Sequence, residues 1–178
     1  PGEISLAHFG VLFLDELPEF KKSTLEVLRG PLEDGIISIS RVNASLTYPC
    51  NFMFVASMNP CPCGFYGSKE KECTCSPQAI QRYMGKISGP LLDRIDIQIE
   101  VTAVKYQKLE TEEEAENSSK IKERVNKARR IQQERYKENG IYSNAELTPK
   151  LVSKYCKLDK EAKAILQNAF EKLGLSAR

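Results

Sequence analysis

The sequence stretch that decides the fold is Leu12-Phe13-Leu14-Asp15-Glu16, a short apolar run that ends in two adjacent carboxylates. Together with Gly10 and Val11, this run is typical of a strand that is buried on both faces of a parallel sheet. A second run of the same kind, Asn51-Phe52-Met53-Phe54-Val55-Ala56, follows later in the chain. The sequence therefore predicts two buried strands of an α/β fold.

The residues between these runs predict one helix and one hairpin. Leu25 and Leu28 lie three positions apart, which predicts a helix over residues 23–29 that ends at Gly30-Pro31. Residues 36–40 and 44–48 then flank a short turn, and in the first of them isoleucines alternate with serines, as in a β-hairpin. Strand, helix, hairpin and strand in this order are compatible with a parallel sheet covered by helices.

The second part of the chain reads as helical. Apolar residues recur at helical spacing over residues 118–136, which predicts an amphipathic helix. A further helix is expected after Thr148-Pro149, and another over residues 159–173.

The balance of acidic and basic side chains changes near residue 104, between the predicted α/β part and the predicted helical part. Residues 1–104 carry 9 basic and 12 acidic side chains, whereas the remaining residues carry 17 and 12. We therefore expect an α/β core over residues 1–104, a linker over 105–117, and a helical domain over 118–178 that is cut off at its end.

Composition excludes several classes of protein. The net charge of +2 argues against a uniformly basic nucleic-acid coat, and 41% hydrophobic residues argue against wholesale disorder. No apolar run approaches the roughly 20 residues of a membrane helix. The start, Pro1-Gly2-Glu3-Ile4, has neither an initiator Met nor a signal peptide. We expect a piece of a longer cytoplasmic protein with no membrane partner.

Asp15 and Glu16 stand where open α/β sheets bind their ligands, at the carboxyl end of a strand. There Asp15 suits Mg²⁺ and Glu16 suits a water that attacks a γ-phosphate, which is the Walker B arrangement. The alternative is an acidic pair that opens a surface turn. A Walker B strand works with a Walker A loop, and the 178 residues contain no G-x-x-x-x-G-K-[ST] sequence.

Four cysteines form a C-x-C, nine residues, C-x-C pattern, and they are Cys61, Cys63, Cys73 and Cys75. Four thiolates on two turns suit a structural zinc ion, with no open position for catalysis. The alternatives are reduced thiols or a bridge formed after purification.

Five motifs are more specific than spacing alone. They are Gly2-Glu3-Ile4-Ser5-Leu6-Ala7-His8, Gly10-Val11-Leu12-Phe13-Leu14-Asp15-Glu16-Leu17-Pro18-Glu19-Phe20, Pro31-Leu32-Glu33-Asp34-Gly35, Asn59-Pro60-Cys61-Pro62-Cys63-Gly64 and Ser88-Gly89-Pro90-Leu91-Leu92-Asp93-Arg94-Ile95-Asp96. Over nearly the whole chain, the sequence closely resembles the magnesium-chelatase-like AAA+ ATPases of bacteria, the YifB or competence protein ComM family. The resemblance implies a partial AAA+ P-loop core with a helical lid domain, and a Walker A loop upstream of this segment.

The resemblance also implies roles for single residues. Asp15 and Glu16 match the Walker B pair, and Asn59 matches the sensor that positions the attacking water. Arg94 matches the arginine finger that reaches a neighbouring subunit's nucleotide, and Arg178 matches the second sensor. From the residues alone, Asn59 before proline also fits a turn, and Arg94 also fits an ion pair with one of the nearby aspartates, Asp93 or Asp96.

The hairpin over residues 36–48 precedes the sensor strand, as does the pre-sensor hairpin of this AAA+ clade, which points into the pore of a ring. Arg41 near its tip is thus expected to contact a DNA phosphate. The alternative is an ordinary turn with an exposed arginine.

The functional expectation is a homo-hexameric motor that uses ATP with Mg²⁺ to remodel DNA, as ComM-like proteins are thought to do in branch migration. One alternative is a chelatase-like remodeller that acts through a protein partner, and another is a zinc-stabilised interaction domain. Without a Walker A loop, these 178 residues alone are expected to hydrolyse no ATP.

Overall fold

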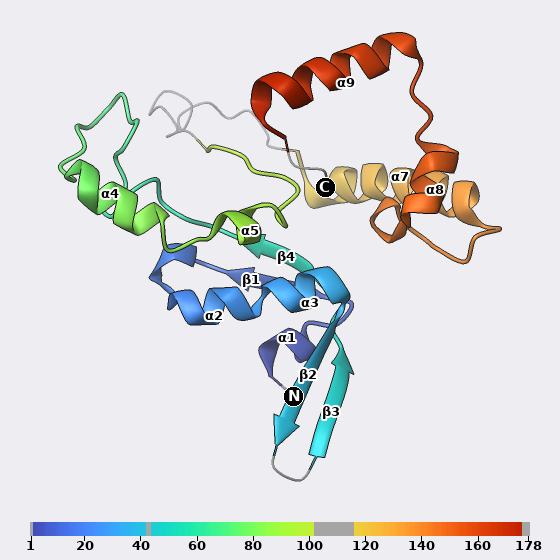
Figure 1. Ribbon diagram of the computed structural model, residues 1–178, viewed down its shortest axis with the longest axis horizontal. Coiled ribbons are helices and arrows are strands. Elements are labelled where there is room, and N and C mark those ends of the chain that lie inside the picture. The colour runs from blue at the N-terminus through green and yellow to red at the C-terminus, as the bar shows by residue number, and fades with distance from the viewer. Residues whose placement is uncertain (1, 42–43, 102–115, 176–178) are drawn as a thin grey trace. The chain divides into compact units, whose positions relative to one another are not determined.

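The computed structural model describes residues 2–41, 44–101 and 116–175. The chain divides into two compact units, Pro1–Ala103 and Val104–Ala177. The first unit is α/β with a parallel strand pair, and the second is helical in its described part (Figure 1). This confirms the α/β fold class, followed by a helical region.

The centre of the first unit is the parallel pairing of β1 (Val11–Leu14) with β4 (Met53–Ala56). Both strands alternate between exposed and partly buried residues, so they are covered on one face and not on both as the sequence predicted. Val11 and Phe13 point outward with more than half of their side chains exposed, at 58% and 56%. The reason is that the core helices of the described unit cover only the other face of this strand pair.

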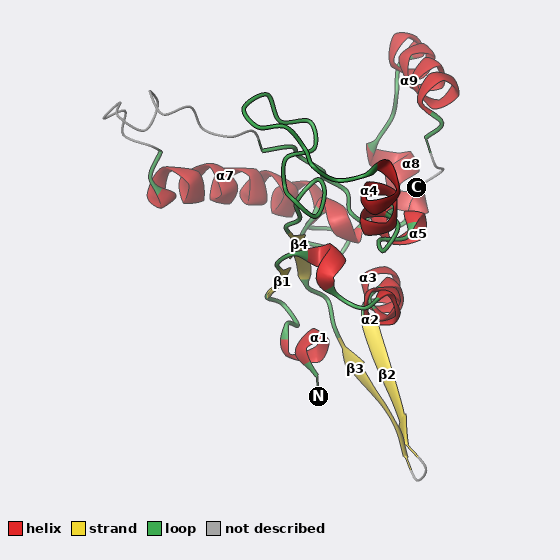
Figure 2. Cartoon of the chain, turned by 90° about the vertical axis from the view of Figure 1, so that its left-hand side faces the viewer, coloured by secondary structure: helices red, strands yellow, loops and turns green. Residues whose placement is uncertain are grey.

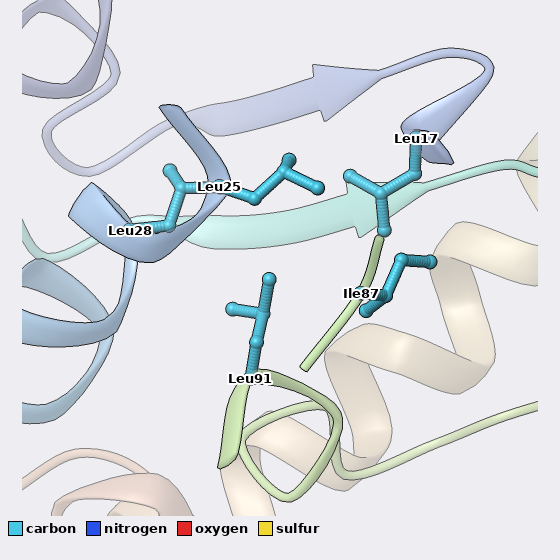
Figure 3. Close-up of a cluster of buried hydrophobic side chains, with 5 residues drawn as sticks. All are labelled: Leu17, Leu25, Leu28, Ile87 and Leu91. Carbon is cyan, nitrogen blue, oxygen red and sulfur yellow. The ribbon is translucent and has the colours of Figure 1, made fainter. Parts of the chain in front are cut away.

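The core of this unit is a cluster of five buried apolar side chains from segments far apart in the sequence (Figure 3). Leu17 belongs to the 3-10 helix η1 (Leu17–Glu19), Leu25 to α2 (Lys22–Val27), and Leu28 directly follows α2. Ile87 follows α4 (Pro77–Met84), and Leu91 belongs to α5 (Gly89–Leu92). The inward residues of both strands pack against this cluster, Leu12 and Leu14 from β1 and Phe54 and Ala56 from β4. Hydrophobic burial therefore fixes how the strand pair meets its helices.

The helix predicted over residues 23–29 differs from the structure at its end. α2 stops at Val27, and a second helix, α3 (Arg29–Asp34), starts directly after Leu28. Gly30-Pro31 therefore lies in the first turn of α3 and does not terminate a helix. Proline is tolerated there because the first N–H groups of a helix have no partner inside it.

The predicted hairpin is confirmed as the antiparallel pair β2 (Ile36–Arg41) and β3 (Ala44–Pro49). It projects away from the β1–β4 pair (Figures 1 and 2). Gly35 joins α3 to β2 with a φ of 66°, which favours glycine, and a Cβ there would lie 2.2 Å from the side-chain oxygen of Asn51. The junction between α3 and the hairpin is thus a single, tightly packed residue.

Three short helices of the first unit were not predicted by apolar spacing: α1 (Glu3–Leu6), α4 (Pro77–Met84) and α5. The last two carry a readable start signal, a serine followed closely by proline. The hydroxyl oxygens of Ser76 and Ser88 accept hydrogen bonds from the backbone N–H groups of Ala79 and Leu91, at 3.2 and 3.4 Å.

The second unit contains α7 (Ser118–Tyr136), the 3-10 helix η2 (Asn144–Glu146), α8 (Pro149–Tyr155) and α9 (Lys160–Leu173). All three predicted helices are confirmed, and Gly174 ends the last one in a left-handed conformation. Tyr136 is buried, and its hydroxyl donates to Asn144 at 2.9 Å. Most of the linker predicted over residues 105–117 lies outside the described residues.

Because Leu91 is fully buried in the core cluster, we expect Leu91→Ala to lower the free energy of unfolding by about 2–5 kcal/mol, through lost burial and a cavity. Leu6→Ala is the matched control, since Leu6 is 67% exposed and should change stability by no more than about 0.5 kcal/mol. Chemical denaturation measures both. Equal effects of the two substitutions would contradict the assigned core.

Candidate functional site

The first candidate site lies where β1 and β4 end side by side. Asp15 and Glu16 follow β1, and Ser57 and Asn59 follow β4. Two backbone bonds continue the strand pairing past these ends: Ser57 N–H donates to Leu14 at 3.0 Å, and Leu17 N–H donates to Ser57 at 2.9 Å. Carboxylates and a sensor-like asparagine thus follow two adjoining strand ends, where α/β sheets bind ligands.

The Asp15 carboxylate is fixed on one side. Its Oδ1 accepts a hydrogen bond from the Ser57 hydroxyl and another from the Glu16 backbone N–H, the latter at 3.0 Å. The second oxygen, Oδ2, has no hydrogen-bond partner among the described residues, and the side chain is exposed. An oriented, solvent-facing carboxylate oxygen suits a hydrated Mg²⁺, so this residue fits the ion.

Glu16 has an unusual backbone, with a φ of 51° and a ψ of 49°. A left-handed conformation of this kind costs a residue other than glycine on the order of 1–3 kcal/mol, and it often accompanies functional sites. Here it turns the chain from β1 directly into η1, and the Glu16 side chain stays exposed at the strand end.

The Asn59 backbone lies near the hydroxyl of Tyr83, a buried residue of α4, and burial and then the charge of Glu19 raise the pKa of Tyr83. The Asn59 side chain itself is exposed at the strand end.

The second candidate site is the cysteine loop that follows Asn59. The metal-binding sulfur atoms of all four cysteines lie within 4.8 Å of one another. Three of the separations are 3.4, 3.7 and 3.5 Å, for the pairs 61–63, 61–73 and 63–73. A tetrahedral zinc site with Zn–S bonds of about 2.3 Å has sulfurs about 3.8 Å apart. The cluster therefore fits a zinc ion.

All six cysteines are free thiols in the structure. The Tyr66 backbone N–H donates to the buried Cys61 sulfur at 3.3 Å. Such N–H donors commonly support metal-bound thiolates.

The thiols differ in acidity. Backbone hydrogen bonding from Phe65 lowers the pKa of Cys63 to about 5. A backbone bond from Cys75 acts to lower the pKa of Cys73, but burial and the neighbouring thiols outweigh it and raise that pKa to about 12. At neutral pH the metal-free cluster thus holds at least one thiolate together with a protonated thiol.

Arg94 follows α5, and its guanidinium is held within its own unit. Nη1 donates to the Pro90 carbonyl at 2.7 Å, and Nη2 forms a hydrogen-bonded ion pair with Glu33 of α3. This partner is neither of the nearby aspartates, because Leu28, just before α3, and Leu91 of α5 belong to one core cluster that brings α5 to α3.

The remaining two candidate residues are described only in part. Arg41 is the last residue of β2 and pairs with Ala44, while its side chain lies outside the described residues. Arg178 also lies outside them. Their roles stay predictions.

The structure adds three residues that sequence reasoning missed: Ser57, Tyr83 and Glu33. For Ser57 a signal existed, because it follows a predicted strand directly, as Asp15 does. Tyr83 and Glu33 carried no such signal, since each acts through a partner far away in the sequence.

No helix in the described part of the chain is long and apolar enough to cross a membrane.

Comparison with known proteins gives consistent matches. The sequence profile of "Magnesium chelatase, subunit ChlI" matches residues 1–109, and that of "Magnesium chelatase, subunit ChlI C-terminal" matches residues 115–178. The whole chain is 47% identical to Competence protein ComM of Haemophilus influenzae and 45% identical to YifB of Escherichia coli, and covers 34% of each. An uncharacterized protein of Mycobacterium bovis is 37% identical, with 35% of its length covered. The chain thus spans about a third of the length of these curated relatives.

We expect the protein to bind one zinc ion per chain and Cys73→Ser to weaken binding by removing one of four ligands. Cys156→Ser is the matched control, because Cys156 is an exposed cysteine outside the cluster. Zinc content after dialysis, measured by atomic emission, compares them. Equal zinc content in the two variants would contradict the cluster as the binding site.

Zinc binding should also weaken as the pH falls from 8 to 6. Cys73 holds its proton in this range because its pKa is raised to about 12, so the metal must displace that proton. The affinity then falls roughly tenfold per pH unit for each proton displaced. Competition with a chelator, corrected for the chelator's own protonation, measures the slope. A slope of zero would show that no thiol proton is displaced.

Proposed function

The chain belongs to the magnesium chelatase subunit ChlI family, and on this premise we propose that it forms part of the ATPase module of a ring-forming AAA+ motor that remodels DNA. The observation that carries the proposal is the parallel pairing of β1 with β4. It sets the carboxylates after β1 beside Ser57, two positions before Asn59.

In this proposal each residue has a separate task. Asp15, held by Ser57, provides an oriented oxygen for Mg²⁺, and the bound ion would neutralise charge on the phosphates. Glu16 accepts a proton from the attacking water and orients it. The Asn59 amide holds the same water, next to the buried Tyr83.

Arg94 is proposed to act on the nucleotide of a neighbouring subunit, and Arg178 on the nucleotide of its own. A guanidinium suits both tasks because it stays charged and binds phosphate oxygens through two parallel donors. Arg94 can reach the nucleotide of a neighbouring subunit only in a ring of subunits, and the family resemblance implies that this ring is a homo-hexamer. They also require a Walker A loop, which the 178 residues do not contain.

The DNA part of the proposal is supported by the projecting β2–β3 hairpin, with Arg41 at the end of β2, and by the similarity to ComM. Phosphate contacts by arginine depend on salt, so DNA binding through this hairpin should weaken as the salt concentration rises. The cysteine cluster is proposed to hold a structural zinc ion that stiffens the loop after Asn59.

A second candidate is a chelatase-like remodeller that acts through a protein partner, which the name of the matching family favours. Both candidates hydrolyse ATP, so only the response to DNA separates them. A zinc-stabilised interaction domain, the third reading, would show no dependence on nucleotide.

In the full-length protein, we expect Glu16→Gln to lower ATP hydrolysis by roughly 10²-fold or more, because the amide cannot take the proton of the attacking water. Glu19→Gln is the matched control: Glu19 is a nearby exposed carboxylate, and within the described residues it forms one loose ion pair, with Lys86 at 3.8 Å. The rate is measured with and without branched or single-stranded DNA.

Stimulation by DNA that disappears in Glu16→Gln and persists in Glu19→Gln would support the DNA motor. Hydrolysis that is indifferent to DNA would favour the chelatase-like remodeller. If Glu16→Gln hydrolysed ATP at the wild-type rate, Glu16 would not be the Walker B glutamate.

A further inference from the structure

The ion pair between Arg94 and Glu33 joins two residues that lie 61 positions apart in the sequence. Arg94 is only 14% exposed, whereas Glu33 is 54% exposed. The Arg94 Nε is buried without a hydrogen-bond partner among the described residues. A buried donor without a partner is unfavourable, so this position of the guanidinium depends on its two remaining anchors, Glu33 and the Pro90 carbonyl.

In this position Arg94 does not present its guanidinium outward. Nη1 and Nη2 are engaged inside the unit, and Nε is buried. A phosphate of a neighbouring subunit would have to compete with the Glu33 carboxylate, since both are anions that bind the same fork of N–H donors. The ion pair with Glu33 therefore decides whether Arg94 can bind a phosphate of a neighbouring subunit.

Glu33 is also connected to the hairpin by a short and rigid path. It lies on α3, whose last residue, Asp34, is separated from the first residue of β2 only by Gly35. The Gly35 carbonyl accepts from the Cys50 N–H at 2.9 Å, just after the end of β3. Both strands of the hairpin thus meet α3 at one point, so a displacement of the hairpin base moves the helix that carries Glu33.

We propose that Glu33 is the positioning residue of Arg94 and couples it to the β2–β3 hairpin, so that DNA bound at the hairpin releases the guanidinium toward a neighbouring subunit. This rests on the function proposed above. The new element is the route: from hairpin to α3, from α3 to Glu33, and from Glu33 to Arg94.

The test uses Glu33→Gln in the full-length protein, because glutamine keeps the size of the side chain and removes its charge. The guanidinium is then released without DNA. We expect the basal kcat for ATP to rise and the ratio of DNA-stimulated to basal kcat to fall by roughly fivefold or more, within the usual range of coupling between sites. The KM for ATP should stay unchanged, because Glu33 does not contact the nucleotide of its own subunit.

A second readout reports on Arg94 directly. Phenylglyoxal modifies accessible arginines, and peptide mass spectrometry locates the modified site. We expect Arg94 to be protected in the wild-type protein without DNA, and to react several-fold faster in Glu33→Gln or after DNA is added to the wild type.

The matched control is Glu116→Gln. Glu116 pairs with Arg124 at 2.8 Å, so its substitution removes an ion pair of the same kind from the second unit. It should leave both the DNA ratio and the reactivity of Arg94 unchanged, and thermal unfolding of both variants checks that they fold.

The outcomes separate this inference from the function on which it rests. If Arg94→Ala hydrolyses ATP normally, or if DNA does not stimulate the wild type, the proposed function fails and the coupling fails with it. If Arg94→Ala is inactive and DNA stimulates, but Glu33→Gln keeps the wild-type ratio and the protection of Arg94, the coupling alone is overturned.

Discussion

The structure of the first unit depends on the parallel pairing of β1 with β4 over one apolar core. The two strands are distant in sequence, and their shared register aligns Leu14 with Ala56. Because parallel strands end at the same edge, the polar residues that follow them meet there. The hydrogen bond from Ser57 to Asp15 is a direct result, and it spans 42 positions of the chain. The Asp15 carboxylate is therefore oriented both by strand pairing, through Ser57, and by its own segment, through the Glu16 N–H.

The cysteine loop extends this organisation beyond the strand ends. It begins two residues after Asn59 and ends at Ser76, which caps the helix that carries Tyr83. Tyr83 in turn lies near the Asn59 backbone. A metal ion that joins the four sulfurs would close this loop, because it links both of its ends. Few apolar residues of the first unit are fully buried, so a metal link of this kind would add stability to a unit whose core is small.

The same core also brings together α3, which leads into the hairpin, and α5, which precedes Arg94. Leu28 precedes α3 and Leu91 lies on α5, and both belong to the core cluster that brings these helices together (Figure 3). The ion pair of Arg94 with Glu33 follows from this proximity. The outward faces of β1 and β4 remain exposed in the described unit, which is a consequence of the same one-sided packing.

The sequence by itself determined the local elements and the spacing of the candidate site residues. Continuous apolar runs predicted both strands, alternation predicted the hairpin, and apolar spacing together with a Thr-Pro start signal predicted the three helices of the second unit, while the cysteine spacing identified the cluster. Periodicity did not decide where α2 ends, because Gly30-Pro31 is compatible both with a helix end and with a first turn. Only the tertiary structure decided that one face of the strand pair is covered, that Ser57 holds Asp15, and that Arg94 pairs with Glu33. These are contacts between segments that the core brings together, and a local pattern that marks a residue such as Ser57 does not identify its distant partner.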